Sequence, residues 1–114
     1  MGAFKQQLIE EETINPAPFS PELRAVLLIL EADRELRNKA LPHVDLVHQE
    51  IDWDSIYEND FGGGHWAALS WAKAIWCDQV STNADPFDRA FAMDQKLQVA
   101  VVKALATRWG LIGE

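Results

Sequence analysis

The fold is decided by residues 65–79, which read HWAALSWAKAIWCDQ. This stretch is rich in helix-forming residues and nearly free of charge, so it predicts a helix. At 100° per residue, Trp66, Trp71 and Trp76 point about 140° apart in succession and therefore spread around that helix. A helix that is apolar on all sides is not a stable surface element. We expect it to be the central element of the domain, or to be covered in part by a second chain.

Two further long helices are predicted on either side of this stretch. Ser20-Pro21-Glu22 combines a capping hydroxyl, a proline at the first helical position and an acid in the first turn, which predicts a helix over 21–40. Asp85-Pro86 repeats this kind of beginning and predicts a helix over 86–109, followed by Gly110 as a left-handed cap. These two helices are the expected neighbours of residues 65–79.

The remaining elements are expected to be short. Phe4, Leu8 and Ile9 lie at helical spacing and predict an amphipathic helix over 3–12. The region 44–58 mixes apolar and acidic residues and predicts two helical fragments, over 44–50 and 54–58. Gly62-Gly63-Gly64 then allows a tight turn into the central helix. The whole chain, residues 1–114, is therefore expected to form one all-α domain, a bundle of three main helices with smaller ones.

Composition restricts the cellular setting that we expect. The chain has one cysteine, Cys77, which excludes an intramolecular disulfide and fits a reducing cytoplasm. Because Cys77 lies in an apolar helical stretch, we expect it to be a buried, inert thiol. The sequence shows neither a secretory signal nor a stretch able to span a bilayer, and no cofactor is expected.

The negative charge is concentrated in the first half of the chain. Residues 1–60 contain 13 acidic and 5 basic side chains, whereas residues 61–114 contain 5 of each. No lysine or arginine occurs between Lys39 and Lys73. Such a surface repels phosphate, so direct binding to nucleic acid or to an anionic membrane is not expected. The acids either bind a basic partner or only keep a tryptophan-rich chain in solution.

We predict a protein-interaction module that binds, and inhibits or neutralises, a basic partner surface. Phage inhibitors, antitoxins and immunity proteins share this profile of small size, acidity and missing catalytic motif, which is an analogy of class alone. The predicted partner-binding residues combine carboxylates with two aromatic anchors. They are Glu50, Asp52, Trp53, Asp54, Tyr57, Glu58 and Asp60.

The alternative is a small enzyme or a metal- or anion-binding domain that uses the His, Asp and Glu residues of 43–65. His48 and Asp52 at i,i+4 could share one helix face toward a divalent ion. The spacing matches no diagnostic metal motif, and no catalytic signature occurs, so no catalytic or metal residue is assigned. Convergence of His48, His65 and Asp60 in an enclosed pocket would favour this alternative.

Self-association is the last expectation from the sequence. A chain of this length offers few helices with which to enclose Trp66, Trp71 and Trp76 on every side. We therefore expect a two-fold homodimer through the helix over 65–79 or the one over 86–109. The competing expectation is a monomer whose central helix is wrapped by the helices at 21–40 and 86–109.

Overall fold

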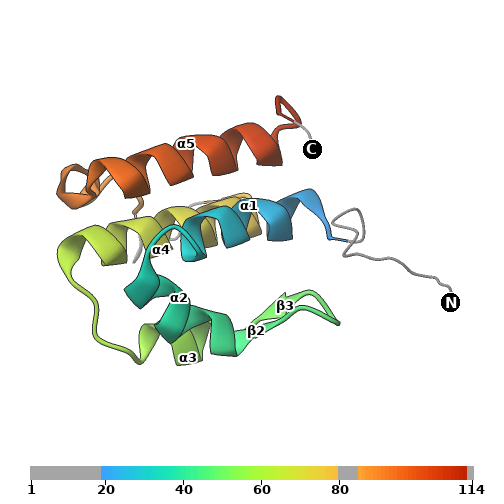
Figure 1. The fold of residues 1–114 in the computed structure, drawn as a ribbon, viewed down its shortest axis with the longest axis horizontal. Coiled ribbons are helices and arrows are strands. Elements are labelled where there is room, and N and C mark those ends of the chain that lie inside the picture. Colours follow the sequence, from blue (N-terminus) through green and yellow to red (C-terminus); the bar gives the residue numbers. More distant parts are fainter. Residues whose placement is uncertain (1–18, 80–84, 113–114) are drawn as a thin grey trace, which may run out of the picture.

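The described part of the chain is mostly helical and contains one small two-stranded sheet (Figure 1). The structure is a computed structural model that describes residues 19–79 and 85–112, so the helix predicted over 3–12 lies outside the described residues. In chain order the elements are α1 (Pro21–Leu30), α2 (Arg34–Ala40), the 3-10 helix η1 (Leu41–His43), β2 (Val44–Asp45), β3 (Glu50–Ile51), α3 (Trp53–Tyr57), α4 (Gly63–Cys77), the 3-10 helix η2 (Ala90–Ala92) and α5 (Gln95–Arg108).

The helix predicted over 21–40 is divided into α1 and α2. It begins as expected, because the Ser20 hydroxyl accepts a hydrogen bond from the Leu23 amide. The prediction is wrong at Asp33, which has an extended backbone and caps α2 by accepting hydrogen bonds from two amides of its first turn. A capping aspartate outside helical geometry starts a new helix, so the chain changes direction between α1 and α2.

The region 44–50 is a β-hairpin, so the helical fragment predicted there is wrong. Val44 pairs with Ile51 and Asp45 pairs with Glu50 in antiparallel register. The Asp45 carboxylate accepts hydrogen bonds from the Val47 and His48 amides of the turn, and Gln49 has a φ of 55°. These local hydrogen bonds compete with a helix and close the turn. The second predicted fragment, 54–58, is confirmed in substance by α3.

The Trp-rich helix is confirmed as α4, although it begins two residues earlier than expected. Its start lies against η2: a Cβ added to Gly64 would be 2.6 Å from the Ala92 carbonyl oxygen. The triple glycine thus permits a close approach of two backbones as well as a turn. Asp78 ends the helix in the left-handed conformation, with a φ of 58°. Cys77 is exposed, contrary to the prediction that it is buried.

The third long helix, α5, begins nine residues later than predicted. The Asp85 carboxylate accepts a hydrogen bond from the Phe87 amide, but Arg89 has a φ of 68°, and only the short 3-10 helix η2 follows this turn. Asp94 provides the N-cap of α5 instead. The predicted end is confirmed, because Gly110 follows the helix with a φ of 74°.

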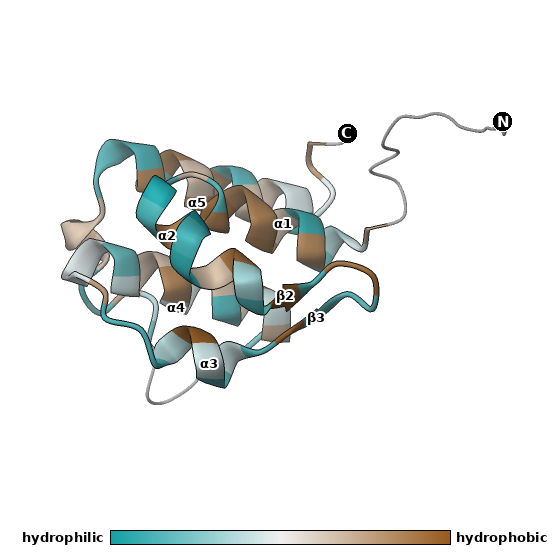
Figure 2. Ribbon diagram, turned by 60° about the horizontal axis from the view of Figure 1, so that its bottom comes forward, coloured by the Kyte–Doolittle hydropathy of each residue, from teal (hydrophilic) through white to brown (hydrophobic). Residues whose placement is uncertain are grey.

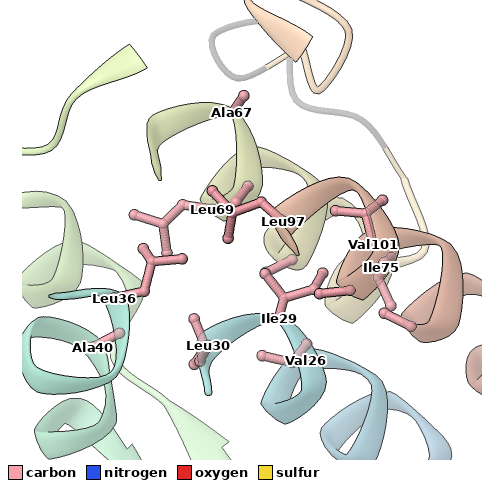
Figure 3. Close-up of a cluster of buried hydrophobic side chains, with 14 of the residues drawn as sticks. Val26, Ile29, Leu30, Leu36, Ala40, Ala67, Leu69, Ile75, Leu97 and Val101 are labelled. Carbon is pink, nitrogen blue, oxygen red and sulfur yellow. The ribbon is translucent and has the colours of Figure 1, made fainter. Parts of the chain in front are cut away.

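The core lies where α1, α4 and α5 meet. In Figure 1, α1 and α5 run side by side in opposite directions and α4 lies next to α1. Figure 3 shows Ile29 of α1, Leu69 of α4 and Leu97 of α5 pointing into one cluster, which Leu36 of α2 joins. Leu69 and Ile29 are fully buried. In Figure 2, the outer α2 is largely hydrophilic, whereas α1 and α4 carry the hydrophobic colouring. The core is therefore shared by three helices, and α1, which packs against both α4 and α5, lies between them more than α4 does.

Candidate interaction surface

The acidic residues of 45–60 lie on the surface. Asp45 and Glu50 belong to the hairpin, while the others lie on α3, at its ends or just before α4. All six of these carboxylates are exposed, namely Asp45, Glu50, Asp52, Asp54, Glu58 and Asp60. The hairpin and α3 are also adjacent in Figure 1, below α1 and α4. The predicted acidic residues therefore share one region of the fold, which we call the acidic surface.

Two of these carboxylates stabilise their own segment. Asp52 caps α3, accepting hydrogen bonds from the Ser55 hydroxyl at 2.7 Å and the Ser55 amide at 3.2 Å, and these bonds lower its pKa. Asp45 lies 2.7 Å from Nδ1 of His48. Hydrogen bonds from the His48 amide and ring lower the pKa of Asp45, and the same contact raises the pKa of His48. Both side chains are well exposed, so we expect the pair to contribute little to stability.

The other four carboxylates make no hydrogen bond or ion pair with any side chain that the structure describes. Glu50, Asp54, Glu58 and Asp60 project from the hairpin, from α3 and from the start of the turn into α4. The nearby Lys39 is engaged by Glu35 at 2.8 Å and by the backbone oxygen of Asp60 at 2.6 Å. These four acids are therefore the part of the acidic surface that is available to a partner.

The two predicted aromatic anchors are half-buried and face the domain. The Tyr57 hydroxyl donates a 3.3 Å hydrogen bond to the Leu69 carbonyl, and its ring packs edge-on against Trp66 with centroids 4.9 Å apart. Burial raises the pKa of Tyr57 to about 12. Trp53 lies beside Tyr57, with centroids 6.3 Å apart. Both rings pack against the core on the inner side of α3. The polar groups on the outer side of α3 are therefore mainly carboxylates.

The histidines that the enzyme alternative requires belong to separate contacts. His48 pairs with Asp45 at the hairpin, whereas Nε2 of His65, at the start of α4, lies 3.0 Å from Asp33. Among residues 19–79 and 85–112, no group of three or more His, Cys, Asp or Glu side chains is placed to hold a metal ion. The structure thus gives His48 and His65 different partners within the fold.

Asp33 forms a junction that sequence reasoning missed. One oxygen of its carboxylate caps α2 and contacts His65 of α4, and the other lies 3.0 Å from the Lys96 ammonium of α5. Burial raises the pKa of Asp33, but the hydrogen bonds from Lys96 and the Leu36 amide, with the charges of His65 and Lys96, lower it to about 2. Lys96 is 63 residues away in sequence, so no local pattern indicated this contact.

A second surface, made of apolar side chains, lies on 85–112. Trp109 is 63% exposed, Val102 is 66% exposed, and Phe91 and Leu111 are also exposed. Beside Trp109, a pocket of about 240 Å³ opens between α4 and α5, and Trp71 and Phe87 line it with their rings 4.9 Å apart. Trp66, Trp71 and Trp76 are themselves half-buried. Most of the large exposed apolar side chains that the structure describes thus lie on α5 and its flanks, and Leu46 and Val47 of the hairpin turn are exposed as well.

Comparisons with known proteins give no relative for this chain: no protein-family model, curated protein or solved structure matches it. In the part of the chain that the structure describes, no helix is both long enough and apolar enough to cross a bilayer.

Proposed function

We propose that this chain is a protein-interaction module whose acidic surface binds, and inhibits or neutralises, a basic partner in the cytoplasm. The observation that supports this proposal is the exposure of the carboxylates of Glu50, Asp54, Glu58 and Asp60, which form no hydrogen bond or ion pair with a described side chain. A concentrated negative field attracts a basic protein and orients it during approach, while it repels nucleic acid. The same field accounts for the expectation of no direct nucleic-acid binding.

Capture of partners from the source cells tests this proposal. The variant carries Asp54→Lys and Glu58→Lys, which leave the α3 cap at Asp52 intact. The matched control carries Glu31→Lys and Asp88→Lys, the same change in charge at exposed acids outside the acidic surface. We expect wild type and control to retain a basic protein that the variant loses, and retention to weaken as salt rises. Equal retention by variant and control, with helicity unchanged, would contradict the proposal.

We also propose that the protein forms a two-fold homodimer, and that α5 provides the contact. The exposed Val102 supports this proposal, because it lies on the side of α5 opposite its buried Leu97 and Ala104, and Trp109, directly after the helix, is also exposed. Apolar side chains on the outer face of a helix are typical of an interface. Light scattering at micromolar concentration tests it: a mass near the single-chain value of 12.9 kDa would contradict a dimer.

A further inference from the structure

A second groove, distinct from the acidic surface, lies between the end of α1 and the first half of α5. It measures about 470 Å³, and Leu28, Ala32, Val99 and Ala100 form its apolar lining. Leu28 is 40% exposed and Val99 is 43% exposed, although the two helices pack closely along their length (Figure 1). The groove is thus an apolar depression between the two helices with room for side chains from another segment.

The polar lining of this groove is neutral or basic. It consists of Gln95, Lys96 and Lys103, and none of the described residues that line the groove is acidic. The Lys96 ammonium is held by Asp33 at 3.0 Å. Lys103 makes no ion pair with any residue of 19–79 or 85–112, and it is exposed. An occupant that combines apolar side chains with carboxylates on one flank would complement both the lining and Lys103.

We propose that residues 3–12 of the same chain bind in this groove. This segment lies outside the described residues, and its sequence carries the complementary chemistry: Phe4, Leu8 and Ile9 at helical spacing, followed by glutamates at 10, 11 and 12. The apolar side chains would cover Leu28 and Val99. The glutamates would lie toward Lys103.

The connecting chain is long enough for this contact. Residues 13–18 can span up to about 20 Å when extended. Leu28 lies eight residues beyond Ser20 along α1, which is about 12 Å at the helical rise. Binding to the same chain also proceeds at the high effective concentration that a short connection provides, so modest contacts suffice. The proposal does not depend on the function assigned to the acidic surface.

Paramagnetic relaxation in the full chain tests the proposal. Cys77→Ser removes the native thiol, and Gln6→Cys carries a nitroxide within the segment. We expect the amide peaks of Leu28, Val99 and Lys103 to be lost in the oxidised sample and to return on reduction. In the same background, Val99→Asp places a carboxylate in the groove and should restore the peaks around it. The matched control, Val102→Asp, is on α5 outside the groove lining and should leave the loss of peaks unchanged.

Two results would overturn the proposal. The first is retention of the groove peaks in the labelled, folded protein. The second is their loss in a mixture of isotope-labelled chains without nitroxide and unlabelled chains with it, because that result would place the segment of a second copy in the groove. The spectrum of each reduced sample reports folding separately, so an unfolded variant is not mistaken for either outcome.

Discussion

The helices α4 and α5 are similar in length, at 15 and 14 residues, but their surroundings differ. α4 packs against α1, α5 and η2, and it also receives the Tyr57 hydroxyl from α3 at the Leu69 carbonyl. α5 buries Leu97, Ala100, Val101 and Ala104 on one face and leaves Val99 and Val102 exposed on the other. The number of neighbouring elements, rather than apolar content alone, decides which helix is enclosed.

The difference in burial between the two helices should show most strongly when one leucine in α4 and one leucine just after α5 are each replaced by alanine. Leu69 of α4 is fully buried, whereas Leu111 after α5 is 73% exposed. Leu69→Ala should lower the free energy of unfolding by about 2–5 kcal/mol, since it removes buried contacts and leaves a cavity. Leu111→Ala should change it by no more than about 0.5 kcal/mol. Urea unfolding followed by tryptophan fluorescence measures both, and equal losses would show that α4 is not the more enclosed helix.

The second prediction concerns Asp33, which joins the starts of both helices through His65 and Lys96. Its side chain is 14% exposed and its pKa is lowered from 3.8 to about 2 in the folded protein. The ionised Asp33 therefore stabilises the folded state fully above about pH 4, and this stabilisation is lost as the pH falls through 2. The lowering of the pKa corresponds to about 2 kcal/mol in the free energy of unfolding.

Asp33→Asn tests this contribution while retaining a good N-cap residue. We expect the wild type to lose about 2 kcal/mol more than the variant between pH 6 and the acid limit, as measured by urea unfolding at a series of pH values. Parallel pH profiles for the two proteins would show that the carboxylate of Asp33 is not stabilised by His65 and Lys96.

Alanine substitution of two adjacent glycines at the start of α4 should change the stability of the protein in opposite directions. A Cβ at Gly64 would be 2.6 Å from the Ala92 carbonyl oxygen, whereas one at Gly63 would have Ala92 Cβ at an ordinary 3.6 Å. Gly64→Ala should therefore destabilise the protein by about 1 kcal/mol or more, because the backbone of η2 must shift. Gly63→Ala should be neutral or stabilising by up to about 1 kcal/mol. Thermal unfolding of both variants measures the contrast, which equal melting temperatures would refute.

The parts of the fold that were predictable from sequence are those with strong local signals. Ser20-Pro21 predicts the start of α1, and the apolar composition of 65–79 predicts α4. The breaks were not predictable, for two different reasons. Gln49 and Arg89 have positive φ values, which are uncommon for their residue types. Asp33 is a common capping residue, but in the sequence it is equally compatible with the surface of one continuous helix.

The acidic surface was predictable and the orientation of its aromatic residues was not. Charge along the chain is visible in the sequence, and exposed carboxylates are the expected outcome. The direction in which Tyr57 points depends on Trp66 and Leu69, to which only the tertiary fold brings it, and Trp53 packs beside Tyr57. The Asp33 junction has the same origin, since its partners come from three elements.

The smallest expected effect concerns the outer face of α5 and separates folding from association. Val102 is 66% exposed, so Val102→Lys should change the free energy of unfolding of the isolated chain by no more than about 0.5 kcal/mol. If α5 forms the proposed dimer contact, the unfolding midpoint of the wild type should rise with protein concentration, because association stabilises the folded state by mass action. In the variant this dependence should disappear, since the lysine must lose water to enter the interface. If the unfolding midpoint of the wild type does not change over a hundredfold range of protein concentration, the outer face of α5 remains in solvent.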